Sequence, residues 1–271
     1  MAKTNTSGLD RYQRAFVALM EKSGYSRSLY TMFRDFCELA ALSLSNAVDL
    51  AQYEQREARY MQIVKGYKAD EVARFPEMLA CIVQSLEEGM KDCLGEIFMS
   101  LDLGNDRAGQ FFTPYHISLL MAKMLSGDAG QRCKERGFVR VMEPAAGAGG
   151  MVIATAQAFA DEGINYQQAM HATCIDVDAA AVHMAYVQLS LLHIPAIIIH
   201  GNALSLEQWG VWYTPAHVLG FWNAKLKRDA GAGQEQAEKA DHAVPAMNEA
   251  VKQRVREVAA VKAGTGQLTL F

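Results

Sequence analysis

Hydrophobic residues recur at three- and four-residue steps through the first hundred positions of the chain. Two groups show this spacing clearly: Phe16, Leu19 and Met20, and then Leu29, Met32, Phe33 and Phe36. Such periodicity is typical of helices that bury one face. Only Pro76 interrupts the region from Leu9 to Met99, and strand signals are weak there. The pattern therefore predicts an α-helical N-terminal domain over residues 1–108.

Short apolar runs replace the helical spacing after residue 136. Three of them end at polar residues: 138–142 before Glu143, 172–175 before Asp176, and 196–199 before His200 and Asn202. Apolar helical stretches over 151–160 and 178–193 separate the runs. Alternating strands and helices are typical of a parallel α/β sheet, and right-handed crossovers predict the strand order 3-2-1.

The pattern becomes weaker after the third run. Residues 216–219 are the best candidate for a fourth strand, which would complete an α/β domain over 109–223. Residues 224–266 are rich in Ala, Gly, Glu, Gln and Lys and predict a linker with a solvated helix near 245–262. The final segment, 267–271, is apolar again.

The composition is that of a globular protein with a sizeable core. The 271 residues are 51% apolar and 21% charged, with a net charge of −4. No run of about 18 apolar residues is present, so we expect no membrane span. The mild acidity argues against holding nucleic acid by bulk charge. Small basic clusters near 225–228 and 252–256 could contact DNA, but solvated helix faces explain them about as well.

The five cysteines favour a reducing compartment. They are odd in number and scattered, and none has the spacing of a zinc or redox motif. Buried free thiols are the simplest interpretation, with no metal site. We therefore expect a cytoplasmic protein.

A glycine-rich loop follows the first predicted strand. It reads Glu-Pro-Ala-Ala-Gly-Ala-Gly-Gly over 143–150 and precedes a predicted helix, so backbone N–H groups and the positive end of a helix dipole meet there. The spacing differs from the GxGxxG of dinucleotide sites. Asp176 stands where an acid accepts both hydroxyls of a ribose, and Asn202 where an amide reaches an adenine edge. Alternatively, the glycines only allow close packing of helix on sheet.

A second cluster, residues 109–116, precedes the first strand. It reads Gly-Gln-Phe-Phe-Thr-Pro-Tyr-His, and Thr113 followed by Pro114 predicts a helix N-cap and first turn. The predicted helix carries apolar residues on one face: Ile117, Leu120, Met121 and Met124. A helix with a favourable N-cap and first turn explains Thr113, Pro114 and the apolar face. It does not explain the two adjacent aromatic residues.

Together, these two motifs at a spacing of about thirty residues resemble the adenine-specific DNA methylase family, in particular the modification subunit of type I restriction–modification systems. The resemblance covers roughly residues 69–204. It implies an S-adenosylmethionine-dependent methyltransferase (Rossmann-like) sheet after a helical domain. It also implies the following cofactor contacts: Phe112, Thr113 and Pro114 at the methionine end, Glu143, Pro144, Ala145, Gly147 and Gly149 around its amino-acid portion, Asp176 on the ribose, and Asn202 with Ala203 beside the adenine.

The chain departs from this family at the motif Asn-Pro-Pro-(Phe/Tyr), which does not occur. In the family, this motif orients the target amine, a poor nucleophile that must be desolvated and relieved of a proton after base flipping. Phe221, Trp222 and Asn223 follow the predicted fourth strand and are candidates to contact the substrate base. Alternatively, Trp209, Trp212, Phe221 and Trp222 cover the exposed side of the first strand. The segment that remains after the third run is short for the other strands and helices of a full sheet, so we expect a truncated one.

The last five residues, Gln-Leu-Thr-Leu-Phe, resemble the bacterial sliding-clamp binding motif. Gln267, Leu268, Leu270 and Phe271 occupy its fixed positions. The segment either binds a partner groove in this way or packs as a last strand in the protein's own core.

The sequence leaves three functions open. The first is methylation of adenine N6 in DNA, alone or with restriction–modification subunits. The second is a catalytically inactive pseudo-methylase that binds cofactor and acts on DNA or on a partner, for example in anti-restriction. A third is a methyltransferase with another substrate. The first is the function that we predict, and it is supported by the two motifs together with Asp176 and Asn202. The missing motif and the short C-terminal half support the second, which is the alternative.

Overall fold

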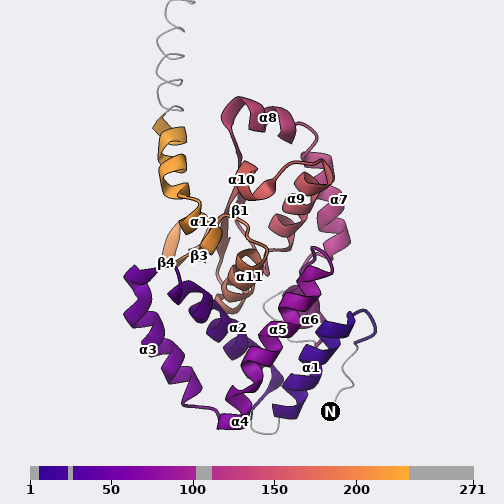
Figure 1. The fold of residues 1–271 in the computed structure, drawn as a ribbon, viewed down its shortest axis with the longest axis vertical. Coiled ribbons are helices and arrows are strands. Elements are labelled where there is room, and N and C mark those ends of the chain that lie inside the picture. Colours follow the sequence, from indigo (N-terminus) through magenta and orange to yellow (C-terminus); the bar gives the residue numbers. More distant parts are fainter. Residues whose placement is uncertain (1–5, 24–26, 102–111, 232–271) are drawn as a thin grey trace, which may run out of the picture. The chain divides into compact units, whose positions relative to one another are not determined.

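In the computed structural model, the elements described before residue 102 are all helical, as predicted (Figure 1). The structure describes residues 6–23, 27–101 and 112–231. Within this region the N-terminal elements are α1 (Arg11–Ser23), α2 (Leu29–Asn46), the 3-10 turn η1 (Leu50–Gln52), α3 (Tyr53–Val64), α4 (Ala69–Val72), α5 (Arg74–Glu87) and α6 (Cys93–Ser100). The periodic residues Phe16, Met32, Phe33 and Phe36 are buried between these helices, which confirms the amphipathic pattern.

The three predicted strands form a parallel sheet in the predicted order. They are β1 (Val139–Glu143), β2 (Met170–Asp176) and β3 (Ala196–Asn202). β2 pairs with β1 on one side and with β3 on the other. For this order, the right-handed crossover rule places the helices of both crossovers on the same face of the sheet.

The fourth strand differs from the prediction. It is β4 (Glu207–Tyr213), which lies antiparallel beside β3 after a short turn. Residues 216–219, predicted as a strand, form the helix α12 (Pro215–Leu219) instead. The reason is local: the Thr214 side chain accepts from the His217 N–H, and Pro215 fits the first turn of a helix.

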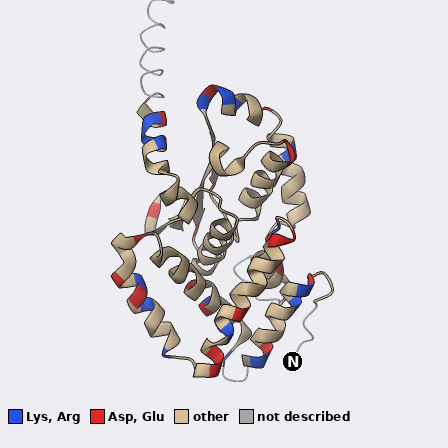
Figure 2. Cartoon of the chain, in the orientation of Figure 1, with Lys and Arg blue, Asp and Glu red and all other residues tan. Residues whose placement is uncertain are grey.

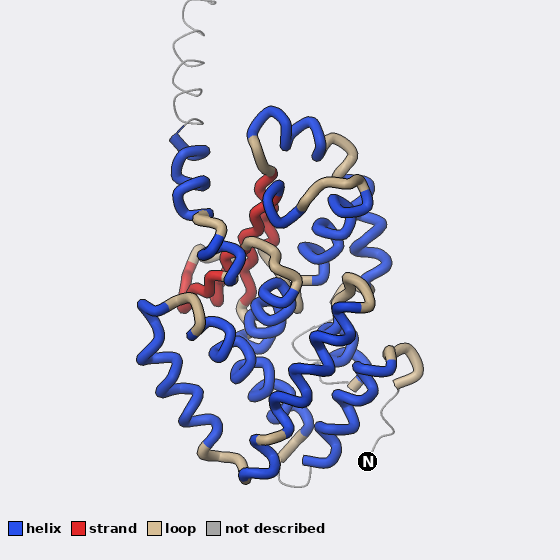
Figure 3. The backbone as a smooth tube through the Cα atoms, viewed as in Figure 1, coloured by secondary structure: helices blue, strands red, loops and turns tan. Residues whose placement is uncertain are grey.

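The remaining helices lie beside the sheet or pack on helices that do (Figure 3). They are α7 (Tyr115–Leu125), α8 (Ala129–Arg136), α9 (Gly150–Asp161), α10 (Tyr166–Ala169) and α11 (Ala179–Leu191). α11 contacts β2 and β3 on one side and α2 on the other. It contains no Lys, Arg, Asp or Glu and is drawn wholly in tan in Figure 2. A helix that is apolar all round is a buried one, and α11 is the central layer between the sheet and the N-terminal helices.

α7 begins one residue later than predicted and exposes its apolar face. Pro114, not Thr113, occupies the N-cap position, and no side chain caps the helix. Ser118 and Ala122 face inward, where α7 packs against α9. Of the face predicted from the sequence, Leu120 and Met124 are 58% and 77% exposed. The apolar stripe therefore lies on the surface of the unit and not in the core.

The helical region and the sheet share one hydrophobic core, which runs from Leu9 to Ile198. The chain divides into a compact unit of residues 1–222 and a second unit that begins at residue 223. The boundary expected between residues 108 and 109 lies outside the described residues, as do the predicted helix at 245–262 and the peptide 267–271. No helix in the described ranges is long and apolar enough to cross a membrane.

Candidate functional site

The glycine-rich loop and the end of β2 are joined by hydrogen bonds. The Gly147 N–H donates to Asp176 Oδ2 at 2.8 Å, and the Ala146 N–H donates to the Ile175 carbonyl at 2.9 Å. Asp176 Oδ1 also accepts from the Asp178 N–H. The predicted loop and the predicted ribose acceptor therefore lie together at the carboxyl ends of the strands, where ligands bind in open parallel sheets.

Phe112 lies directly against this loop. Gly147 has φ +52°, and a Cβ built there would stand 2.9 Å from Cδ1 of the Phe112 ring. Phe112 also packs on Phe98 of α6, with ring centroids 5.2 Å apart. Only glycine combines this backbone conformation with the close approach of the ring. The structure thus brings together the two motifs that the sequence placed about thirty residues apart.

Glu143, at the end of β1, faces the same region. Its Oε1 accepts from the Ala145 N–H at 3.2 Å. Burial raises the pKa of Glu143, and the nearby charge of Asp176 raises it further, although the bond from Ala145 acts in the opposite direction. Two carboxyl groups at neighbouring strand ends suit a ligand that offers several donor groups.

Sequence reasoning missed a buried polar cluster below the loop. Asp92, at the N-cap of α6, accepts at Oδ1 from the Gly95 N–H and from Gln188 Nε2. Gln188 is fully buried and also donates to the Ala148 carbonyl at 2.8 Å, while its Oε1 accepts from the Leu94 N–H. This side chain of α11 therefore ties the glycine-rich loop to α6. The helix N-cap signal at Asp92 was visible in the sequence, but its link to Gln188 was not.

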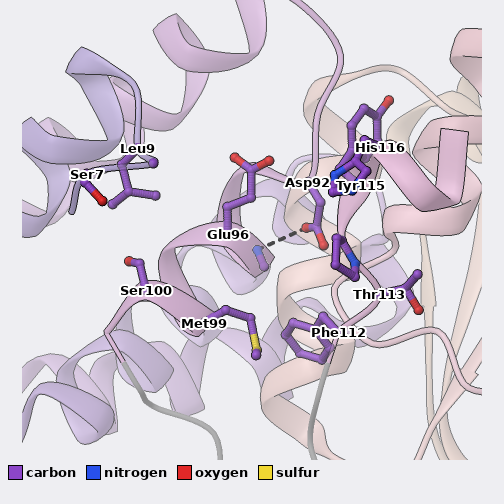
Figure 4. Close-up of a pocket in the computed structure, with 13 residues that line it drawn as sticks. Ser7, Leu9, Asp92, Glu96, Met99, Ser100, Phe112, Thr113, Tyr115 and His116 are labelled. Carbon is purple, nitrogen blue, oxygen red and sulfur yellow. Dashed lines mark hydrogen bonds between the residues drawn. The ribbon is translucent and has the colours of Figure 1, made fainter. Parts of the chain in front are cut away.

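Two cavities adjoin these residues. A cavity of about 600 Å³ lies between the N-terminal segment, α6 and the Phe112–His116 segment. Figure 4 shows the Asp92 side chain between the helix that carries Glu96 and the segment that carries Thr113 and Tyr115. A second cavity, of about 90 Å³, lies between Asp92, Thr113, Ser118 and the glycine-rich loop. Among the described lining residues of both cavities there is no Lys or Arg.

Asn202 stands at the end of β3, as predicted, but its side chain is engaged locally. Its Oδ1 accepts from the N–H groups of Leu204 and Ser205, at 2.9 and 3.3 Å, and so shapes the turn into β4. Ala203 is partly buried within that turn. Both residues lie at the strand end that was expected to flank an adenine.

The aromatic pair after α12 lies away from the loop. Trp222 is 1% exposed and packs on Phe138 and His171, near the starts of β1 and β2, whereas the glycine-rich loop follows the end of β1. Phe221 is 77% exposed, and Asn223 is also exposed. The structure thus does not bring Trp222 to the glycine-rich loop.

The tryptophans of β4 are also placed differently from the alternative expectation. β4 lies at the opposite edge of the sheet from β1, so Trp209 and Trp212 do not cover the first strand. Instead, the guanidinium of Arg56 lies over the ring of Trp212 in a cation–π contact, 4.2 Å from the ring centroid. Arg56 also donates to the Val211 carbonyl and pairs with Asp49 at 2.8 Å. This buried contact joins α3 to β4.

Beside Trp222, two histidines form a buried pair. His171 Nε2 and His217 Nδ1 are 2.8 Å apart, and both side chains are nearly inaccessible. Burial lowers the pKa of His171 to about 3, and the proximity of His217 contributes to this shift. The His171 imidazole is therefore held neutral, and its contact with His217 fixes α12 against β2.

Comparisons with known proteins agree with the sequence resemblance. No curated protein matches the chain. Among solved structures, the chain is similar to a Listeria monocytogenes protein assigned to the class I S-adenosylmethionine-dependent methyltransferases, with a TM-score of 0.37 and 13% identity. The match covers 71% of this chain and 54% of that one, so the similar region spans about half of that protein. The sequence profile of the N-6 DNA methylases matches residues 92–239, more than half of this chain, which therefore belongs to the N-6 DNA methylase family.

Proposed function

We propose that this protein binds S-adenosylmethionine at the glycine-rich loop and transfers its methyl group to N6 of adenine in DNA. The observation that carries the proposal is the joined arrangement of Phe112, Gly147 and Asp176 at the carboxyl ends of parallel strands. Membership of the N-6 DNA methylase family supports the same reaction.

The residues present fit such a cofactor. Gly147 and Gly150 leave space where a Cβ would meet Phe112 or Asp92. A buried hydroxyl that has no partner among the described residues, Ser118 Oγ, lines the adjoining cavity. Asp176 would accept from the ribose hydroxyls and Asn202 with Ala203 would flank the adenine. Phe112, Thr113 and Pro114 would border the methionine end, beside Glu143 and the loop that starts at Pro144.

The cofactor would supply an electrophilic methyl group. The protein's part is to hold it in line with the exocyclic amine, to exclude water and to accept a proton from the amine. The chain lacks the Asn-Pro-Pro-(Phe/Tyr) motif, and Trp222 is buried away from the loop. No residue is therefore assigned to orient the amine.

The alternative is a pseudo-methylase that binds cofactor and acts on DNA or on a partner without methyl transfer. The placement of Trp222 favours it, because this candidate stacking partner for a flipped base is part of the core, and of the aromatic pair only Phe221 is exposed. Anti-restriction activity would be one role of such a protein.

Measuring N6-methyladenine in DNA from cells that express the protein separates these functions. Mass spectrometry of the nucleosides and digestion by methylation-sensitive nucleases are the readouts, with Asp176→Ala as the control. New N6-methyladenine that disappears in the control supports the enzyme. Unmodified DNA from a protein that binds S-adenosylmethionine in calorimetry supports the pseudo-methylase instead.

We also propose two kinds of partner. One is the other subunits of a type I restriction–modification system, which co-purification from cells carrying such a system would test.

The other proposed partner is the sliding clamp. It would be bound through Gln267, Leu268, Leu270 and Phe271, a segment outside the described residues. Removing Leu270 and Phe271 should abolish capture of purified clamp. Undiminished capture by the shortened protein would show that the motif is accidental. The five free cysteines are consistent with a cytoplasmic setting for these partners.

A further inference from the structure

The larger cavity has the size of a ligand-binding site. Its volume is about 600 Å³, and such sites typically measure about 300–1,000 Å³. Three segments supply its lining: Ser7 and Leu9 before α1, Glu96, Met99 and Ser100 on α6, and Phe112 to His116 (Figure 4). None of its described lining residues belongs to the glycine-rich loop, so the cavity offers room for a second ligand.

The larger cavity adjoins the proposed cofactor site. Asp92, Phe112 and Thr113 line both this cavity and the smaller one, which also borders the glycine-rich loop. The proposed function puts the methionine end of the cofactor beside Phe112 and Thr113. A ligand in the larger cavity would therefore be a neighbour of that end, where a methyl acceptor has to be held.

The polar groups of the larger cavity favour a ligand that donates hydrogen bonds. Its described lining contains two carboxyl groups, Asp92 and Glu96, and no Lys or Arg. This lining disfavours phosphate and carboxylate groups and favours an amine. Leu9, Met99 and Pro114 add apolar surface against which a flat ring can pack. The exocyclic amine of a nucleobase combines both properties.

A buried amide holds Glu96 in place. Gln13 is 1% exposed, and its Nε2 donates to Glu96 Oε2 at 2.8 Å. The orientation of this amide is fixed, because its Oε1 accepts from the Asp10 N–H at 2.8 Å. The second carboxylate oxygen, Glu96 Oε1, has no hydrogen-bond partner among the described residues. Glu96 is thus a positioned acceptor with one oxygen left for a ligand.

We propose that the larger cavity receives the acceptor base of DNA and that Glu96 Oε1 accepts a hydrogen bond from its exocyclic amine. The inference rests on the proposed function and adds a substrate-binding residue to it. Glu96 orients the amine in a chain that lacks the Asn-Pro-Pro-(Phe/Tyr) motif. The group that recognises the base then belongs to α6, in the helical region, and not to the end of a strand.

Three deoxynucleosides that differ at position 6 of the purine test this assignment. Deoxyadenosine carries an amine there, purine deoxyriboside a hydrogen and deoxyinosine a carbonyl. Ligand-detected NMR measures their binding while S-adenosylhomocysteine saturates the cofactor site, so that no nucleoside enters it. The unmodified protein should bind deoxyadenosine about tenfold more tightly than purine deoxyriboside, the effect of one hydrogen bond to a charged group. Deoxyinosine should bind most weakly, because its carbonyl meets a carboxylate.

Glu96→Gln should reverse the preference between deoxyadenosine and deoxyinosine. Because Gln13 donates to this side chain, the new amide turns its oxygen to Gln13 and leaves its NH2 group for the ligand. That group donates to the carbonyl of deoxyinosine but not to an amine. A structural defect would instead weaken all three nucleosides alike. Glu77→Gln, at an exposed residue of α5, is the control and should keep the original order.

Three results would overturn the inference. They are equal affinities of the unmodified protein for deoxyadenosine and purine deoxyriboside, an unchanged order in Glu96→Gln, and no binding of deoxyadenosine while S-adenosylhomocysteine is bound. If S-adenosylhomocysteine does not bind at all, the proposed function fails. The order of the three nucleosides, measured without it, then still decides whether Glu96 recognises the amine.

Discussion

The backbone N–H of Gly147 donates a hydrogen bond to the carboxylate of Asp176, at 2.8 Å, and so links the loop after β1 to the end of β2. The same carboxylate is the predicted acceptor for the ribose. We therefore expect cofactor binding and the conformation of the loop to depend on the same side chain.

Replacing Asp176 by alanine should weaken cofactor binding far more than it lowers the free energy of unfolding. The change removes the ribose acceptor and the anchor of the loop, so we expect binding of S-adenosylhomocysteine to weaken at least tenfold, about the effect of one hydrogen bond to a charged group. Isothermal titration calorimetry measures this. Asp178→Ala is the matched control: it removes the N-cap of α11 and should cost about 1 kcal/mol of stability without such a loss of affinity. Equal affinities of the two variants would contradict the role of Asp176.

Gly147→Ala should destabilise the protein through two effects. A left-handed conformation costs a non-glycine residue about 1–2 kcal/mol, and the added methyl group would clash with the ring of Phe112. Overpacking adds about 1–3 kcal/mol. Urea unfolding measures the sum. Gly163→Ala provides the comparison, because Gly163 has φ +74° with open space around it and should show only the first effect. Equal losses in the two variants would mean that Phe112 does not press on the loop.

Acid should destabilise the protein through the pair His171–His217. The pKa of His171 is lowered from its ordinary value of 6.5 to about 3, so between these values the unfolded chain binds a proton that the folded chain does not. Stability is therefore lost as the pH falls from 6.5 towards 3, by about 2 kcal/mol at pH 5 for this group.

Urea unfolding at pH 7.5 and pH 5 tests this with His171→Phe, which keeps a ring beside Trp222. Asp92 has a raised pKa, so its protonation stabilises the folded protein as the pH falls, whereas protonation of His171 destabilises it. The difference between variant and parent therefore reports on His171 better than either curve alone. The parent should lose more stability on acidification than the variant. Parallel losses would show that His171 is not held neutral.

Trp222 and Phe221 are neighbours with opposite expected effects. Trp222→Ala removes a buried ring that packs on Phe138 and His171, so we expect a loss of about 3–5 kcal/mol. Phe221→Ala changes an exposed side chain and should stay within about 0.5 kcal/mol. Thermal and urea unfolding report both. A large loss for Phe221→Ala would mean that this ring is buried in solution.

Local signals in the sequence predict the strands that form the site. Apolar runs in the sequence end at Glu143, Asp176 and Asn202. Parallel pairing and the crossover rule are enough to place these three strand ends side by side. The segment after β3 departs from the prediction for a physical reason. A turn shaped by Asn202 sends the chain back antiparallel as β4, and Thr214 with Pro215 then starts a helix where a strand was expected.

The deeper part of the site could not be predicted from local pattern. The bond between Asp92 and Gln188 joins residues 96 positions apart. Each residue looks ordinary by itself, one as a helix cap and the other as a polar residue in an apolar helix. Their relation depends on how α6 packs against α11, which no spacing rule encodes. The burial of Ser118, whose hydroxyl has no partner among the described residues, could not be predicted for the same reason.

The burial of α11 on all sides decides what can be expressed as a fragment. The family profile begins at residue 92, yet α2 covers the side of α11 that faces away from the sheet. A fragment starting at residue 92 would leave that apolar surface open to water and would be prone to aggregate. It would also lose the contact of Arg56 with Trp212 and Val211. We therefore expect the region that folds stably to be larger than the region that the family profile matches.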